Sequence, residues 1–235
     1  MAHTAATLRS MKQLYCVRGY RSAVAGMMGA MPLNEAMARS VGSDSIESFD
    51  RIGAAELSLL EELGFARGNA LVDVGCGSGR LASQIGGRFG DSVCYVGTDV
   101  VPELLDFARE RTPRPYSFLC VDACVIPAPD ESADFVTLFS VFTHLRRREI
   151  HQYLREARRV LRPGGRIVFS YLSPLLHRGI FLRTAWRRGN IENHFATSGT
   201  IARWARTHRF SAPQLFPGRI GQSVAVLHKP IMAYR

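Results

Sequence analysis

Short apolar runs alternate with amphipathic stretches along most of this chain. The runs have the length of strands, and several end in a polar or acidic residue. Within 148–161 the apolar residues recur three and four positions apart, as on one face of a helix. The predicted strands are 71–74, 93–99, 116–122, 133–140, 166–171, 210–216 and 222–228. Because strands that alternate with helices form parallel βαβ units, the pattern predicts an α/β fold with a doubly wound, mostly parallel sheet.

The two ends of the chain depart from this alternation. Residues 1–45 carry six of the seven methionines and end in a small, polar stretch, so we predict an N-terminal helical cap over 1–45 and a catalytic domain over 46–235. Residues 172–195 have a looser pattern, and we expect them to cover the site. After them, Thr197 or Ser198 can cap a helix that contains Ile201, Trp204 and Ala205.

The first predicted strand runs straight into a glycine-rich turn, Leu71-Val-Asp-Val-Gly-Cys-Gly-Ser-Gly79, and a helix follows at Arg80. Glycines let backbone N–H groups approach a ligand closely, and the helix start directs further N–H groups to the same place. A dinucleotide-binding loop would place its third glycine one residue later, and a phosphate-binding P-loop would end in Gly-Lys-Ser/Thr. The loop therefore favours a different nucleoside ligand.

Two further predicted strands end in acids. Asp99 lies twenty residues past Gly79, where a carboxylate can accept hydrogen bonds from both hydroxyls of a ribose. Asp122 ends the third strand and is followed by the small residue Ala123. Singly, such acids more often cap the next helix, for which Pro102 is a suitable first residue. Their order and spacing favour the binding role.

The glycine loop, the two acids and the turn Arg162-Pro-Gly-Gly165 together make the chain resemble the class I S-adenosylmethionine (SAM) dependent methyltransferases over roughly residues 50 to 230. The resemblance implies a seven-stranded Rossmann-like sheet whose last two strands form an antiparallel hairpin at the edge. It also implies SAM as the cofactor, with Asp122 at the adenine amino group. The implied cofactor-binding residues are Asp73, Gly75, Cys76, Gly77, Gly79, Asp99, Val100, Asp122, Ala123, Ser140 and Val141.

Chemistry is expected where the strands end, because open α/β sheets bind ligands at their carboxyl edge. If the acceptor is a hydroxyl, His144 is the best candidate base by position and type, although it can equally pack against or cap the next helix. Tyr171, at the end of the fifth predicted strand, is the second catalytic candidate, and His177 and His194 follow it. The chain lacks the Asn/Asp-Pro-Pro-Tyr/Phe motif of base-flipping N-methyltransferases.

Three functions remain open at this point. The first is methyl transfer from SAM to an oxygen or nitrogen of a small molecule. The second is intramolecular cyclisation of SAM to azetidine-2-carboxylate and methylthioadenosine, in which Tyr171 would stabilise the sulfonium by a cation–π contact. The third is a basic RNA-binding methyltransferase or a non-catalytic SAM-binding partner, which strong salt-dependent RNA affinity would reveal.

Composition narrows the class of protein further. The net charge of +10 comes almost wholly from arginine, since only Lys12 and Lys229 are lysine. The arginines could form solvated helix faces or bind nucleic acid or another polyanion, and we prefer the first interpretation. The five cysteines are odd in number and lack zinc spacing, so we expect reduced thiols and no metal. No apolar run is long enough to span a bilayer, and we expect a cytoplasmic protein without a membrane partner. The oligomeric state stays open.

Overall fold

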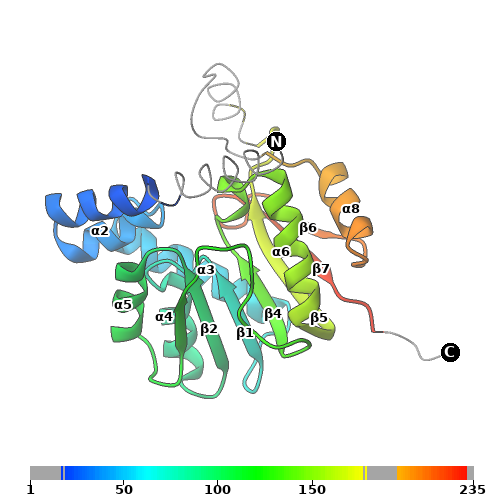
Figure 1. Ribbon diagram of the computed structural model, residues 1–235, viewed down its shortest axis with the longest axis horizontal. Helices are drawn as coiled ribbons and strands as arrows, with labels where there is room; N and C mark the ends of the chain where they lie inside the picture. The colour runs from blue at the N-terminus through cyan, green and yellow to red at the C-terminus, as the bar shows by residue number, and fades with distance from the viewer. Residues whose placement is uncertain (1–16, 18, 177, 179–194, 232–235) are drawn as a thin grey trace, which may run out of the picture.

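Seven strands form one mixed sheet, as the sequence predicts (Figure 1). The computed structural model describes residues 17, 19–176, 178 and 195–231. The strands are β1 (Ala70–Val74), β2 (Cys94–Asp99), β3 (Ser117–Cys120), β4 (Ala133–Leu138), β5 (Leu161–Tyr171), β6 (Gln214–Phe216) and β7 (Ser223–His228), in the spatial order β3-β2-β1-β4-β5-β7-β6. β1 to β5 pair in parallel, and β7 pairs antiparallel with β5 and β6. The hairpin predicted at the sheet edge is confirmed.

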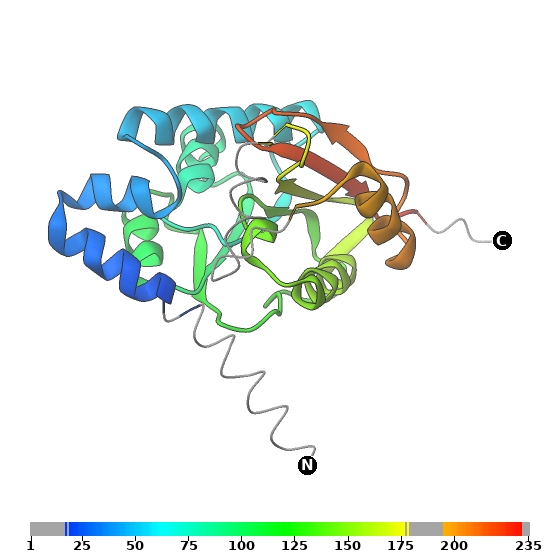
Figure 2. The same cartoon turned by 90° about the horizontal axis from the view of Figure 1, so that it is seen from above.

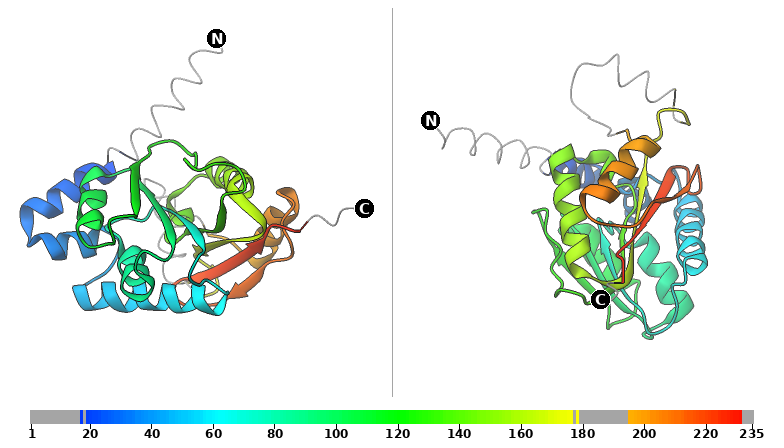
Figure 3. Two further views of the ribbon diagram at one scale, coloured as in Figure 1. Left: turned by 90° about the horizontal axis from the view of Figure 1, so that it is seen from below. Right: turned by 90° about the vertical axis from the view of Figure 1, so that its right-hand side faces the viewer.

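Helices cover both faces of the sheet. They are α2 (Leu33–Ser40), α3 (Ile46–Glu62), α4 (Arg80–Phe89), α5 (Pro102–Glu110), the 3₁₀ turn η1 (Phe142–His144), α6 (Arg147–Val160) and α8 (Ser198–Thr207), and residues 19–30 are also helical. On one face, α6 and α8 pack through Leu154 and Trp204 against strand residues such as Val136. On the other, Leu60 and Ile85 belong to the cluster that α3 and α4 form with the sheet. Figure 3 shows these layers end on.

Local sequence signals set several helix ends. Pro102 is in the first turn of α5, as predicted. The Thr197 hydroxyl accepts a hydrogen bond from the backbone N–H of Thr200 at 3.2 Å, so Thr197 is the cap of α8. Ser45 and Ser48 form a reciprocal capping box at the start of α3. α3 thus begins directly after residue 45, although the division of the chain into a cap and a catalytic domain stays a prediction.

The junction between α6 and β5 differs in detail from the expected one. We predicted a strand only from 166, but β5 already pairs with β4 at Leu161, so α6 ends at Val160. The Arg162-Pro-Gly-Gly165 turn is a bulge within the strand, because the pairing moves from Ala133 with Leu161 to Phe135 with Arg166. Gly164 has the left-handed φ of +84° that this bulge requires.

The N-terminal helices pack beside α5 (Figure 2). Val24 and Met37 are buried together with Val101, Leu104 and Phe107 in a small apolar cluster at this end of the sheet. The predicted cap of residues 1–45 lies only partly within the described residues, because 1–16 and 18 fall outside them. The covering segment predicted over 172–195 likewise lies mostly outside them, and with it His177 and His194.

Candidate functional site at the carboxyl edge of the sheet

The glycine-rich loop joins β1 to α4. Gly75, Gly77 and Gly79 have φ values of +70°, +55° and +81°, which side-chain-bearing residues rarely adopt. A Cβ atom on Gly75 would lie 2.4 Å from a methyl carbon of Val141, and one on Gly77 would lie 2.3 Å from a methyl carbon of Val41. The loop is therefore packed between the exit of β4 and the turn after α2, and only glycine fits there.

Asp99, at the end of β2, holds the loop in place through hydrogen bonds to its carboxylate group. Its two carboxylate oxygens accept hydrogen bonds from the backbone N–H groups of Gly77 and Val101, both at 3.0 Å. The residue is 7% exposed. Burial raises the pKa of this carboxyl group, and the backbone hydrogen bonds partly oppose the shift. Each oxygen keeps a further acceptor site, as the ribose role requires.

Asp73, predicted to bind the cofactor, lies in β1 just before the loop. Its carboxylate accepts hydrogen bonds from the hydroxyls of Tyr95 and Thr137, each at 2.7 Å. Burial raises the pKa of Asp73 to about 7. Asp73 thus ties β1 to the neighbouring strands β2 and β4. Sequence reasoning missed Tyr95 and Thr137, since no local motif marks them.

Cys76, the residue inside the loop, is buried. Its backbone N–H donates to the carbonyl of Thr98 at 2.9 Å, and the N–H of Gly75 donates to the same carbonyl at 2.7 Å. Burial raises the pKa of the Cys76 thiol well above its usual range, so the side chain stays neutral. Cys76 therefore supports the loop through its backbone and its packing.

The predicted adenine side lies next to Asp99. Asp122 and Ala123 follow β3 and are exposed, and Val100 follows β2. The backbone carbonyl of Val100 accepts a hydrogen bond from Nε of Arg21 at 2.7 Å. Tyr20 lies on the same N-terminal helix. Its pKa is raised by burial and by the nearby Asp99 carboxylate. Sequence reasoning predicted this helix as part of the N-terminal cap but did not place Arg21 beside the site.

A ring of neutral hydrogen bonds fixes the exit of β4. Ser140 has a left-handed φ of +59°, a strained conformation for a serine. Its backbone N–H donates to Oγ of Ser170 at 2.7 Å, and the Ser170 hydroxyl donates to Oε1 of Gln222 at 2.7 Å. Nε2 of Gln222 donates back to Oγ of Ser140 at 3.2 Å. Val141, the next residue, packs over Gly75, so this ring positions part of the loop's wall.

The two catalytic candidates differ in exposure. His144 ends η1 and its side chain is exposed, while its backbone N–H donates to the carbonyl of Val141 at 3.0 Å. Desolvation by the surrounding protein lowers the pKa of His144, which favours the neutral, proton-accepting imidazole. Tyr171 is 5% exposed, lies in the core cluster under α6 and α8, and pairs with Ser223 across the sheet. Because Tyr171 is buried, it is a weaker catalytic candidate than His144.

The sheet order brings these residues to one edge. β2, β1, β4 and β5 are neighbours, and the glycine loop, Asp99, Ser140 and His144 all follow the carboxyl ends of β1, β2 and β4. The buried carboxylate beside a close-approach glycine loop fits a ribose and the polar chain attached to it. The fold is that of a doubly wound α/β protein, and this edge is its candidate nucleoside-binding site.

Known proteins share this architecture. Residues 72–169 match the family described as a methyltransferase domain. The chain is 29% identical over 184 residues to malonyl-[acyl-carrier protein] O-methyltransferase of Methylococcus capsulatus, covering 76% of this chain and 65% of that protein. It is 30% identical over 133 residues to the biotin biosynthesis bifunctional protein BioHC of Cellvibrio japonicus, covering 57% of this chain and 25% of that protein.

Magnesium protoporphyrin IX methyltransferase from Synechocystis, solved with bound S-adenosylhomocysteine (SAH), has a similar fold. The TM-score is 0.60 at 15% identity, over 81% of this chain and 92% of that one. Residues 72–169 are therefore similar in sequence to methyltransferase domains, and the seven-stranded sheet shares the fold of this solved methyltransferase. The chain spans less than two thirds of the curated relatives named above. Within 19–176 and 195–231, no helix has the length and apolarity of a membrane span.

Proposed function

We propose that this chain transfers the methyl group of SAM to an oxygen or nitrogen atom of a small-molecule acceptor. The observation that carries the proposal is the juxtaposition, at one sheet edge, of the Asp99-braced glycine loop with the exposed imidazole of His144. Bound SAM supplies an electrophilic methyl carbon. The protein then has to align an acceptor behind that carbon and exclude water.

Each part of the edge has a distinct task in this proposal. Asp99 accepts the ribose hydroxyls, Asp122 and Ala123 adjoin the adenine, and the glycine loop lies against the methionine part. Ser140 and Val141 form the wall between the cofactor and the acceptor. Because the relative from Methylococcus capsulatus is named an O-methyltransferase, acceptors with oxygen nucleophiles are the first to test.

His144 is the proposed general base for an acceptor that must lose a proton. Its imidazole is neutral near pH 7, since its pKa is lowered, and it is exposed to an incoming molecule. We expect His144→Gln to lower kcat by about 10²- to 10⁴-fold for a hydroxyl acceptor and to leave SAM affinity unchanged. An amine acceptor that is already neutral should be affected far less.

The decisive experiment incubates the purified protein with SAM, with and without an acceptor extract, and follows the nucleoside products by mass spectrometry. Three variants serve as controls. Gly77→Arg places a side chain where even a Cβ meets Val41, and Asp99→Asn should weaken SAM binding about 10- to 100-fold through the loss of charge-assisted hydrogen bonds. Asp106→Asn, an exposed acid on α5, controls for charge.

The products separate the candidate functions. SAH that forms only with acceptor, and not in the two cofactor-site variants, supports methyl transfer. Methylthioadenosine that forms from SAM alone contradicts the proposal and establishes intramolecular cyclisation. SAH that forms only with added RNA contradicts the small-molecule acceptor and establishes RNA methylation.

A further inference from the structure

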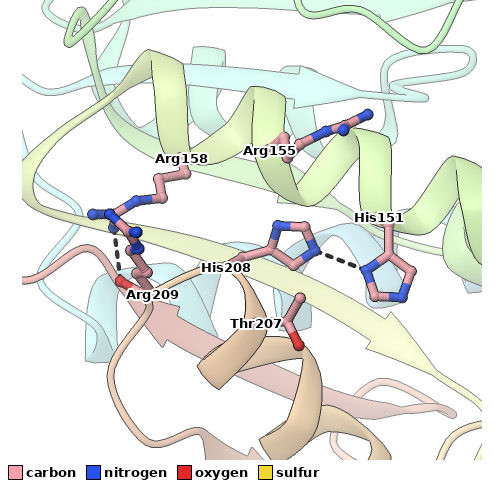
Figure 4. A pocket seen from close by; sticks show the side chains of 6 residues that line it. All are labelled: His151, Arg155, Arg158, Thr207, His208 and Arg209. Carbon is pink, nitrogen blue, oxygen red and sulfur yellow. Dashed lines mark hydrogen bonds between the residues drawn. The ribbon is translucent and has the colours of Figure 1, made fainter.

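A pocket lies on the outer side of the molecule, between α6 and the C-terminal end of α8 (Figure 4). Its volume is about 490 Å³. The residues that line it are His151, Arg155, Arg158, Thr207, His208 and Arg209. His151, Arg155 and Arg158 are spaced four and three residues apart on α6, so they share one face of the helix. None of the predicted cofactor-binding or catalytic residues is among them.

The charges of this pocket are not compensated by acids. Both acids of α6 are engaged elsewhere, since Glu149 pairs with Arg146 and Glu156 pairs with Arg159. Within the described part of the chain, the pocket arginines Arg155, Arg158 and Arg209 make no salt bridge. The pocket arginines therefore have no directly paired carboxylate among the described residues.

Arg159 shows how the outward arginines of α6 differ. We predicted solvated faces for Arg155, Arg158 and Arg159, but Arg159 binds Glu156, Asp130 and two loop carbonyls, so its role is structural. Arg158 donates to the backbone carbonyl of Arg209 at 2.8 Å, which holds it at the pocket wall. Arg155 is exposed.

Two imidazoles face each other in the pocket (Figure 4). Nδ1 of His151 and Nε2 of His208 are 2.8 Å apart, so one ring donates a proton to the other. The carbonyls at the end of α8 are satisfied within the chain, because the N–H groups of His208, Arg209 and Phe210 donate to them. The remaining polar groups offered to a ligand are thus mainly donors or groups that become donors on protonation.

We propose that this pocket binds a phosphoryl group, the terminal phosphate of a small molecule. A phosphate dianion would accept charge-assisted hydrogen bonds from guanidinium groups on two different elements and from an imidazole N–H. The open pocket has room for a small molecule that carries such a group, whereas a nucleic-acid strand would need a basic groove that tracks its backbone. The site is independent of the proposed methyl transfer.

The phosphate should also change the titration of the two histidines. In the free protein, burial and the neighbouring arginines lower the pKa of both rings, that of His208 to about 4. Arg147 and Arg155 act on His151, and His151 and Arg155 act on His208, while Arg158 and Arg209 complete the pocket. A bound dianion favours the imidazolium form, so the pKa values rise when it binds.

The experiment titrates inorganic phosphate into the whole chain at constant ionic strength and follows the ring ¹H–¹⁵N signals of His151 and His208 by NMR. We expect saturable shifts with phosphate and none with chloride at the same ionic strength. Arg155→Gln should weaken phosphate binding about tenfold or more. Arg203→Gln is the matched control, because Arg203 is an exposed arginine of α8 outside the pocket.

Several results would overturn the proposal. Equal shifts with chloride, or equal weakening by Arg155→Gln and Arg203→Gln, would mean that net charge alone attracts anions. A single-stranded RNA that displaces phosphate, with an affinity that grows with its length, would replace the small phosphorylated ligand by a nucleic acid. Since Arg155 is exposed, its replacement is not expected to unfold the protein, and a circular dichroism spectrum checks this.

Discussion

The two halves of the strand-end crevice are held by different chemistry. On the cofactor side, buried charges organise the backbone: Asp99 holds the glycine loop, and Glu56 pairs with Arg80 at the start of α4. On the acceptor side, Ser140, Ser170 and Gln222 form a neutral ring. Buried charges are costly unless fully paired, whereas a neutral ring loses less when one member is removed. The cofactor side should therefore be the more sensitive to single substitutions.

The largest expected effect comes from breaking the buried ion pair. Glu56 is 1% exposed, and both its oxygens accept hydrogen bonds from Arg80, which also donates to the carbonyl of Val41. Glu56→Ala leaves the Arg80 guanidinium buried without its counterion, so we expect a loss of about 3–5 kcal/mol in the free energy of unfolding. Urea denaturation measures it.

An exposed ion pair of the same type provides the control. Glu61 also belongs to α3 and pairs with Arg88 of α4 at 3.0 Å, but the side chain of Arg88 is 65% exposed and that of Glu61 is 35% exposed. Glu61→Ala should cost at most about 1 kcal/mol. Equal losses in the two variants would show that burial does not distinguish the pairs and would remove the charge-based account of the cofactor side.

The distance between contacting residues along the chain explains which site residues the sequence reveals. Gly75, Gly77, Gly79 and Asp99 could be predicted because the turn is contiguous and its φ values demand glycine, and because a strand-end acid follows at a fixed distance. The parallel sheet followed from the alternation of apolar runs with helical stretches. Both signals are local, so a single sequence contains them in full.

The supporting contacts could not be predicted because they join positions far apart in sequence. Thr137 is 64 residues from the Asp73 that it binds, and Gln222 is 82 residues from Ser140. No spacing rule links such pairs until the strand order is known. The bulge at the start of β5 could not be predicted for another reason. Pro and Gly usually end a strand, but here the pairing continues on both sides of them.

A substitution in the neutral ring tests the acceptor side. Ser170 is fully buried, and Ser170→Ala removes the acceptor of the Ser140 N–H and the donor to Gln222. We expect a loss of about 1–3 kcal/mol in the free energy of unfolding, because two partly buried polar groups, the Ser140 N–H and the Gln222 side-chain carbonyl, lose their partner. Because the ring holds Ser140 and Val141 at the wall between cofactor and acceptor, kcat should fall by a larger factor than the affinity for SAM.

A serine with only a local hydrogen bond is the control for this variant. The Ser83 hydroxyl donates to the carbonyl of Arg80 within α4, so Ser83→Ala should change stability by no more than about 0.5 kcal/mol. Calorimetric titration with SAM separates the two sides of the crevice. A weaker SAM affinity in Ser170→Ala, matching its loss of kcat, would mean that the ring supports the cofactor side instead.

The most gradual expected effect is a pH dependence that arises at Asp73, because its free-energy change is spread over several pH units. Its pKa is about 7 in the folded protein and about 3.9 in an unfolded chain, so between these values the folded state holds a proton that the unfolded state has lost. Stability therefore falls as pH rises through this window, by at most about 1.4 kcal/mol per pH unit from this group. Asp73→Asn should flatten that slope, because an amide does not titrate.

Urea denaturation of the protein and the variant from pH 4.5 to 7.5 measures the slope. The Thr137 hydroxyl, which donates to Asp73, can rotate to accept from the asparagine amide, so the variant keeps a hydrogen-bonded link between β1 and β4. Asp44→Asn, at an exposed position, should leave the slope unchanged. An unchanged slope in Asp73→Asn would mean that the carboxylate is stabilised by its two hydroxyl donors more strongly than burial destabilises it. The charged and neutral halves of the crevice would then respond alike to pH.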